Sequence, residues 1–551
     1  MKIRFTLILL ALFQISLNHV CAQSLQNENS GLPLNPNRSI LFGKDIVIND
    51  TAMGDQRNVA ICSAFNGWLY AAYWVKEVGS NVASMQLTIM KSEDSGMNWD
   101  VLRTILTGGP REIFSSFKIA VCGNDLTNLK LFLGLIYYDT LYHSGTVVVP
   151  RFNGITGETE TDILNDQSVD AHDIDIATDY NYPASNSDPG SFAILYSKHQ
   201  GSTDSLIFYS SSNGGMTLNN HRVVSKSSDQ FQFRKVALNY GRSSSYIDGQ
   251  YFAAWELISI NNSDFDHIYT AHSELNINGP FTNKVCLDSI DLSTINKCKN
   301  PVICCQFGGF DNDSSNMTEV ILAENQDISN NYYKVVGFYN RNAATSNHFT
   351  KFNLTSTAHY ETQPWINFNP YDSTFMVTYY DSTTQKLPFL LNNFNLKNPD
   401  SWQFVTAGYN DNNNLAAPYP KVALNLDQKQ GINVWSGERT GGNGVAMFDA
   451  PYSTYTEISE NSTNVQLLLY GSYPNPCSKE VTIWFEIQNP EKVTTTLYDI
   501  SNHILKISTS QTCQAGRGVV KFDISTLSPG CYFYSLSSDK FSGSGKVIVI
   551  E

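Results

Sequence analysis

The sequence predicts an all-β protein: a seven-bladed β-propeller of four-stranded blades, followed by a small C-terminal β-sandwich. First, an apolar residue pair recurs seven times at spacings of 57 to 66 residues, and such a period is typical of repeat architectures. Second, 29 tyrosines and 30 phenylalanines accompany only 16% charged residues, which favours strands over helices. Third, the repeat stops after Ala450, where a second domain is expected.

The apolar pairs mark the first strand of each blade. Each pair is followed by a second strand-like run that ends in tyrosine, tryptophan or glutamate. The pairs are Val59-Ala60, Ile119-Ala120, Ile176-Ala177, Val236-Ala237, Val302-Ile303, Trp365-Ile366 and Val422-Ala423.

Alternating residues and turn signals predict four strands in each unit. In the first unit these are Asn58–Ser63, Trp68–Trp74, Met85–Met90 and Asp100–Leu106. The second strand recurs at Leu131–Tyr137, Phe192–Tyr196, Tyr251–Glu256, Glu319–Ala323, Phe375–Tyr380 and Ile432–Trp435. The third recurs at Thr146–Arg151, Leu206–Tyr209, His267–Ala271, Tyr333–Phe338, Leu387–Leu391 and Val445–Phe448. Seven such units fit the usual range for a propeller.

The segment Ile40–Ile48 has strand character but no unit of its own. We interpret it as the outer strand of the last blade, which would close the ring without leaving an open sheet edge. An independent N-terminal strand is the alternative. The propeller is therefore expected to span residues 40–450.

Residues 1–22 have the features of a secretory signal peptide. Lys2 and Arg4 precede an apolar run, and Val20-Cys21-Ala22 offers small residues for cleavage. Lipid attachment at Cys21 is the alternative, but the residues just before it are not small. No later stretch approaches the ~20 apolar residues of a spanning helix, so no transmembrane helix is expected.

One octet, Ser92–Trp99, has the composition of a hairpin turn between the third and fourth strands. Ser92 and Asp94 can accept hydrogen bonds from turn amides, and Gly96 can adopt a positive φ. Trp99 then begins the next strand as an apolar plug.

A looser copy stands at Ser211–Leu218, where Ser211, Asn213 and Gly215 occupy the positions of serine, aspartate and glycine. The two octets resemble the Asp-box, or BNR repeat, of sialidase-like β-propellers. In that family the box is a folding device on the blade periphery. The resemblance therefore implies a fold and assigns these residues a structural role.

After the propeller, residues 451–464 are predicted to form a polar linker and residues 465–551 a separate domain of short strands. Its motifs are Tyr473-Pro474-Asn475-Pro476, Thr482-Ile483-Trp484-Phe485, Leu497-Tyr498-Asp499, Asp523-Ile524-Ser525-Thr526-Leu527 and Pro529-Gly530-Cys531-Tyr532-Phe533-Tyr534. In this order they resemble the C-terminal sorting domain of type IX secretion cargo in Bacteroidetes. The resemblance implies that the type IX machinery acts on residues 465–551 and delivers the protein to the cell surface or the medium.

The formal charge of −15 at pH 7 argues against nucleic acid or an anionic membrane as a partner, and a monomer is expected. Removal of the signal peptide would leave nine cysteines, an odd number. Cys286 and Cys298 flank a loop and could pair. Because no CxxC pair occurs, no structural zinc site is expected.

A sialidase needs an arginine cluster for a carboxylate, a Tyr–Glu nucleophile pair and an acidic Asp. Arg57 stands where the resemblance places the first arginine, although the neighbouring Ile and Pro of that motif are missing. Arg234 and Tyr419 precede their own apolar pairs at similar offsets and complete the catalytic candidates. The set is incomplete, and loop arginines with ordinary partners are the alternative.

Asp173 and Asp175 alternate with isoleucines along one strand, so both carboxylates share a face that could line the axial channel. They could bind a cation or polar ligand, with a hydrated channel as the alternative. Other acidic loops contain Asp264 and Asp266 or Asp311 and Asp313, but none matches an EF-hand. No cofactor and no metal site are therefore predicted, and calcium is left as an alternative without a motif.

Two function classes follow. The first is a non-catalytic module, exported to the cell surface or medium, that recognises a glycan or an extracellular protein. It is favoured because no complete catalytic set is visible. The second is a divergent sialidase-like glycoside hydrolase, which would need acidic and basic side chains to converge at one end of the axis.

Overall fold

The computed structural model describes residues 39–42, 45–49, most of 54–454 and most of 467–550. The larger internal gaps are residues 77–84, 180–189, 243–248, 274–279, 289–295, 307–316 and 393–401. The predicted signal peptide and most of the predicted linker lie outside the described residues. The chain divides into two compact units, Met1–Ser453 and Thr454–Glu551. Within the described ranges, the structure contains no helix with the length and apolar character that crossing a membrane requires.

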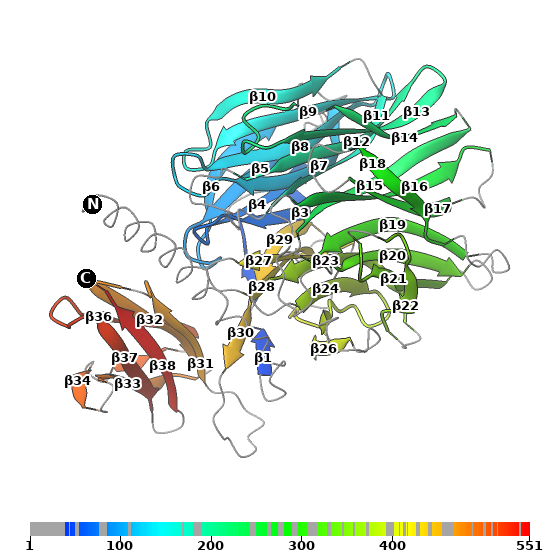
Figure 1. Cartoon of the computed structure of the whole chain (residues 1–551). Helices are drawn as coiled ribbons and strands as arrows, with labels where there is room; N and C mark the ends of the chain where they lie inside the picture. Colours follow the sequence, from blue (N-terminus) through cyan, green and yellow to red (C-terminus); the bar gives the residue numbers. More distant parts are fainter. Residues whose placement is uncertain are drawn as a thin grey trace, which may run out of the picture. The chain divides into compact units, whose positions relative to one another are not determined.

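The first unit is an all-β propeller. Its described residues form seven four-stranded antiparallel sheets arranged as blades (Figure 1). The inner strands are β3 (Asp55–Ser63), β7 (Glu112–Cys122), β11 (Asp170–Thr178), β15 (Phe231–Gly241), β19 (Asn296–Cys305), β23 (Glu361–Asn369) and β27 (Lys421–Asn425). Each inner strand contacts the next, and β27 contacts β3, so the ring is closed. Each predicted apolar pair lies on one of these inner strands.

The remaining strands continue each blade outward in chain order. The second strands are β4 (Leu69–Lys76), β8 (Lys130–Asp139), β12 (Phe192–Gln200), β16 (Gln250–Ser259), β20 (Glu319–Asp327), β24 (Thr374–Asp381) and β28 (Gln430–Glu438). The third are β5 (Met85–Ser92), β9 (Ser144–Asn153), β13 (Thr203–Ser211), β17 (Asp266–Ser273), β21 (Tyr332–Asn340), β25 (Phe389–Asn392) and β29 (Gly444–Asp449). The outer strands are β6 (Asp100–Leu106), β10 (Thr159–Asp166), β14 (Arg222–Ser228), β18 (Phe281–Cys286), β22 (Thr350–Asn353), β26 (Gln403–Thr406) and β2 (Ile46–Val47).

Strand β2 closes the ring as predicted, but only Ile46–Val47 of the predicted segment Ile40–Ile48 forms this outer strand, and residues 40–42 belong to β1 (Ser39–Phe42) in another sheet. Ile46 pairs with Phe448 and Val47 with Met447 on β29, so the N-terminal segment supplies the outer strand of the last blade. On the inner side, the side chain of Gln56 accepts a hydrogen bond from the Ala446 amide at 2.9 Å. The backbone pairing of β2 therefore completes the last blade, and the side chain of Gln56 bonds the first blade to it.

The start of the predicted linker differs from expectation. Residues 451–454 form strand β30 (Pro451–Thr454), which pairs with β1 (Ser39–Phe42) in a two-stranded sheet. Tyrosine and threonine favour extended backbone, and proline is tolerated as the first residue of a strand. The linker was predicted from polar composition, which does not distinguish a loop from a short strand.

The two predicted turn octets make the same hydrogen bonds. The Ser92 Oγ accepts the Gly96 amide at 2.8 Å, and the Asp94 Oδ1 accepts the Asn98 amide at 2.8 Å. In the second octet the Ser211 Oγ accepts the Gly215 amide and Asn213 Oδ1 the Thr217 amide, each at 3.0 Å. Asparagine therefore replaces aspartate without loss of the turn, because an amide oxygen accepts the same bond.

The second unit is a sandwich of two antiparallel sheets. One contains β31 (Leu467–Tyr473), β32 (Glu480–Ile487) and β36 (Gly516–Asp523). The other contains β34 (Ile504–Ile507), β33 (Glu491–Tyr498), β37 (Gly530–Ser537), β38 (Ser542–Val549) and β35 (Gln511–Cys513). Asn475 explains the first motif: its side chain accepts the Ile548 amide at 2.7 Å and donates to the Lys546 carbonyl at 2.9 Å. These bonds fix the segment before β32 against the last strand.

The nine cysteines in the described part of the chain are not joined in disulfides. The pairing of Cys286 with Cys298 that the sequence suggested is therefore not present. Each sulfur instead contacts an oxygen acceptor: Cys286 Sγ lies 3.4 Å from Asp288 Oδ1, and Cys298 Sγ lies 3.3 Å from Asn325 Oδ1.

Candidate functional site

A cavity of about 150 Å³ lies where the inner strands converge, and residues from all seven of those strands line it. Its walls are mainly small or aliphatic, because the apolar pairs reach it. Ala60, Ala120, Ala177, Ala237 and Ala423 are among the lining residues. Small side chains on successive inner strands leave room at the axis, and this room is the candidate site.

Four charged or aromatic side chains gather in this cavity, and we call them the axial cluster: Lys118, Asp175, Trp365 and Lys421. The Lys118 Nζ lies 3.6 Å from Asp175 Oδ1. Both Lys118 Nζ and Lys421 Nζ lie 5.0 Å from the centre of the Trp365 ring. Two ammonium groups within reach of one indole ring form a cation–π arrangement.

Burial changes the proton affinity of this cluster. Desolvation, together with the positive charge of Lys118, lowers the pKa of Lys421 to about 7. Desolvation raises the pKa of Asp175, while the charge of Lys118 and two backbone amides oppose that change. Lys421 is therefore poised to gain or lose a proton near neutral pH, and an anion entering the cavity would favour its charged form.

Sequence alternation placed Asp173 and Asp175 on one face, and the structure adds their partners. Asp173 Oδ2 accepts the Val236 amide at 3.0 Å, and Asp175 Oδ2 accepts the Leu238 amide at 2.8 Å. Both carboxylates therefore attach β11 to the next inner strand, β15. Asp175 also lines the cavity, so it combines a structural bond with a place in the site.

The catalytic candidates lie elsewhere. Arg57 Nε is 2.8 Å from Asp55 Oδ1, and its Nη2 is 3.8 Å from Glu438 Oε1 on β28, so its charge is shared between two carboxylates. The exposed Arg234 donates to Gln232 at 2.5 Å. Tyr419 is 47% exposed, and its amide donates to Gln363 Oε1 at 2.8 Å. None of the three lines the axial cavity in the described part of the chain.

Lys118 and Lys421 were missed by sequence reasoning, although a signal exists. Each stands directly before an apolar pair, as Asp175 does. Lys235 also stands directly before its pair, so four charged residues share this offset in a repeat with few charges, and three of them, Lys118, Asp175 and Lys421, line the cavity. The signal is obscured because β-bulges shift the register of several inner strands, as between Arg57 and Ala60 or between Arg234 and Val236.

The lowered pKa of Lys421 gives a testable pH dependence. In the unfolded state Lys421 stays protonated up to its ordinary pKa of 10.5, whereas in the folded state it loses its proton near pH 7. Above pH 7 the unfolded state therefore binds more protons than the folded state. We therefore expect the stability of the native protein, relative to Lys421→Met, to be constant below pH 7 and to rise by about 2 kcal/mol between pH 7 and 9. Chemical denaturation of both proteins at pH 6, 7, 8 and 9 measures this difference. Parallel pH curves would show that Lys421 is not desolvated as described.

The fold and its axial cluster define the class: an all-β propeller protein with a central, lysine-containing cavity. The second unit indicates how the protein is exported. Residues 472–551 match the family model described as a secretion system C-terminal sorting domain. The protein is therefore secreted through the type IX system to the cell surface or the extracellular space.

Solved structures similar to this chain include glycosidases and a protein of unknown function. An α-L-arabinanase from Penicillium chrysogenum is 10% identical over 75% of this chain and 98% of its own, with a TM-score of 0.42. A mutant of the NanB sialidase from Streptococcus pneumoniae is 10% identical over 77% and 72%, with a TM-score of 0.37. A protein of unknown function from Dyadobacter fermentans is 10% identical over 76% and 100%, with a TM-score of 0.38. These similarities are too low to transfer functional residues.

No curated protein sequence matches this chain.

Proposed function

We propose that this protein is an exported recognition module whose axial cavity binds an acidic group of a glycan or extracellular protein without catalysing a reaction. The observation that supports this proposal is the convergence of Lys118 and Lys421 on Trp365 in the axial cavity. The whole chain carries a formal charge of −15, yet this site has two lysines against one aspartate. A local excess of positive charge in an acidic protein favours an anionic ligand.

The size and chemistry of the cavity limit what it binds. Its volume of about 150 Å³ corresponds to about five water molecules at ~30 Å³ each, enough for a single charged group or one sugar ring. A carboxylate or sulfate placed between the lysines would accept charge-assisted hydrogen bonds from both ammonium groups. The indole and the surrounding alanines would contact the apolar part of the same ligand.

The divergent glycosidase is the weaker candidate. Hydrolysis of a glycosidic bond by either common route needs two carboxyl groups, one acting as acid and the other as base or nucleophile. Asp175 is the single carboxylic acid among the described lining residues of the cavity, and it is bound to Lys118 and to two backbone amides. Binding therefore fits the described side chains better than hydrolysis does.

A glycan array of acidic and neutral glycans, run beside fluorogenic glycosides that include sialosides, tests the proposal. We expect saturable binding of acidic glycans without turnover. Lys421→Met and Lys118→Met should each weaken that binding about 10-fold or more, since each removes one charge-assisted contact.

Lys91→Met is the matched control, because Lys91 Nζ also lies over an indole ring, that of Trp68 at 4.5 Å, but outside the axial cavity. It should leave binding unchanged. Turnover of a glycoside that Arg57→Ala abolishes would instead establish the hydrolase. If the protein neither binds nor hydrolyses any glycan, the same variants should be tested for binding to extracellular proteins. Binding that both Lys118→Met and Lys421→Met leave unchanged would refute the axial site.

A further inference from the structure

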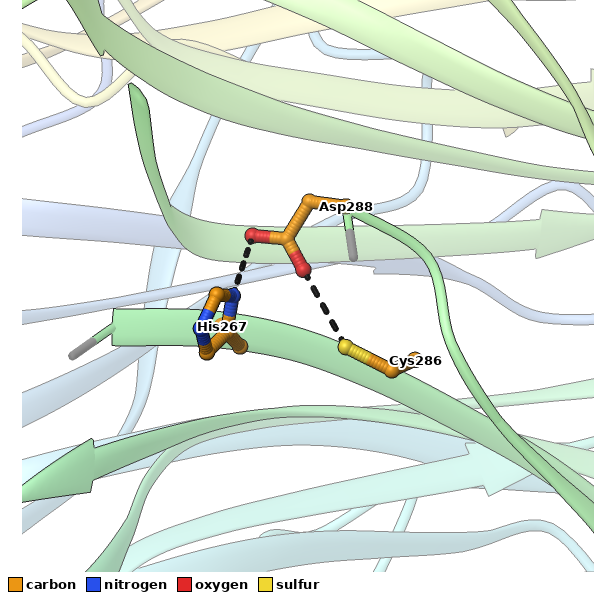
Figure 2. A group of neighbouring side chains, drawn as sticks. All are labelled: His267, Cys286 and Asp288. Carbon is orange, nitrogen blue, oxygen red and sulfur yellow. Dashed lines mark hydrogen bonds and ion pairs between the residues drawn. The ribbon is translucent and has the colours of Figure 1, made fainter. Parts of the chain in front are cut away.

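A second group of chemically capable side chains lies in the fourth blade, away from the axial cavity. His267 is on β17, Cys286 is the last residue of the outer strand β18, and Asp288 follows two residues later. Figure 2 shows the Asp288 carboxylate facing both other side chains. Its Oδ2 lies 3.3 Å from His267 Nδ1, and its Oδ1 lies 3.4 Å from Cys286 Sγ.

The sheet register brings the three residues together. Tyr269 pairs with Cys286 between β17 and β18, and continuing this antiparallel register places residue 288 opposite His267. Because side chains alternate along a strand, all three then share one face. The Leu287 amide donates to the Ile268 carbonyl at 2.9 Å, which continues the ladder one step past the end of β18.

The carboxylate of Asp288 accepts hydrogen bonds through one oxygen, and its other oxygen can still accept a further contact. Its Oδ1 accepts the Ile268 amide at 3.3 Å as well as the thiol. Its side chain is only 5% exposed, and among the described residues Oδ2 has an ion-pair contact with His267 Nδ1 but no hydrogen bond of normal geometry. A buried carboxylate oxygen with remaining acceptor capacity, aimed at an imidazole, is a position that a cation would satisfy.

This arrangement does not suit nucleophilic catalysis. A catalytic cysteine requires its base within hydrogen-bonding reach, with the acid orienting the base from the far side. Here the carboxylate contacts both the thiol and the imidazole, so it occupies the place of the base. The arrangement suits a metal ion better, because all three ligand atoms lie within 4.8 Å of one another. Ligands about 2.0 to 2.3 Å from a tetrahedral ion lie roughly 3.4 to 3.7 Å apart.

We propose that His267, Cys286 and Asp288 bind one zinc-type divalent cation, with a fourth position open to solvent. Thiolate, imidazole and carboxylate together favour zinc over calcium or magnesium, which prefer oxygen ligands alone. The His267 side chain is 22% exposed, so the site is open on the imidazole side. The ion would attach the end of the outer strand β18 to β17, protecting an edge of the fourth blade. This site has no CxxC motif, because one ligand, His267, lies on β17 and the other two lie at the end of β18 and just after it.

Titration of the purified, reduced chain with Co²⁺ as a spectroscopic substitute for zinc tests this site. We expect one equivalent to bind and to give a thiolate-to-cobalt charge-transfer absorption that Zn²⁺ abolishes by displacement. Cys286→Ser should lose the charge-transfer absorption. Asp288→Asn should weaken binding at least ~100-fold, because losing even an outer-shell partner of a metal ligand costs about 10- to 100-fold.

Two variants serve as controls. His199→Ala removes another histidine that lies near a carboxylate, 3.6 Å from Asp204, and Cys531→Ser removes a half-buried thiol in the second unit. Both should keep the cobalt absorption, and circular dichroism should show that every variant folds. The proposal is overturned if the absorption survives Cys286→Ser or disappears with a control. It is also overturned if mass spectrometry of the exported protein finds Cys286 joined to Cys298.

Discussion

Removal of residues 472–551 is expected to abolish appearance of the protein outside the cell and to leave it in the periplasm. These residues match the sorting-domain family, and they fold as part of a unit separate from the propeller. Their core is built from residues of that unit alone, among them Val481, Phe485, Leu497 and Tyr534. The propeller should therefore fold without them, so that the loss concerns transport. Immunoblots of periplasm, cell surface and medium measure the distribution.

A narrower change addresses the same domain. Asn475 holds the segment before β32 against the last strand through two backbone bonds, so Asn475→Ala should reduce export without removing the domain. The reciprocal test joins residues 465–551 to a periplasmic reporter, which should then leave the cell. Unchanged extracellular amounts of the truncated protein would contradict the sorting role.

The blade pattern could be predicted from the sequence because it depends on local alternation and on a long repeat. Each apolar pair occupies an inner strand because the axis is the most crowded part of a propeller and accepts small or aliphatic residues. Ring closure was predictable for a different reason: Ile46 and Val47 have strand character but no unit of their own, and an unpaired strand needs a partner.

The candidate site was only partly predictable. Alternation along a single strand put Asp173 and Asp175 on one face, and of these two Asp175 is a lining residue of the cavity. The partners of Asp175 lie on other blades: Lys118 on β7, Leu238 on β15 and Lys421 on β27. Nothing in local sequence sets the distances between residues so far apart. For the same reason, Arg57 could be located before its inner strand, but its contact with Glu438 on the last blade could not.

The turn octets also contribute more than a local hairpin. Gly96 has φ +93°, and a Cβ placed on it would lie 2.2 Å from the Phe448 ring of the last blade. Trp99 packs against the same ring, with centroids 5.5 Å apart. In the second octet, a Cβ on Gly215 would lie 2.4 Å from Phe132 of the preceding blade. Each octet therefore packs against an aromatic ring of a neighbouring blade, a role that its turn chemistry does not reveal.

Gly96→Ala should accordingly destabilise the propeller by about 3 kcal/mol. Positive φ costs a residue with a Cβ about 1 to 2 kcal/mol, and overpacking against an aromatic ring adds about 1 to 3 kcal/mol. Gly201→Ala separates these two contributions, because Gly201 has φ +66° but no atom within 4 Å of its added Cβ. It should cost only the first contribution. Equilibrium denaturation of the propeller transition measures both variants.

The clash can be relieved while the backbone is left unchanged. Phe448→Leu makes room beside Gly96, so Gly96→Ala in that background should lose most of the overpacking contribution and approach the effect of Gly201→Ala. The interaction free energy from this double-mutant cycle should be about 1 to 3 kcal/mol. An interaction near zero would mean that the ring of Phe448 moves aside freely. The first octet would then act mainly as a hairpin turn, and the contact of Gly96 with Phe448 would add little to the stability of the ring.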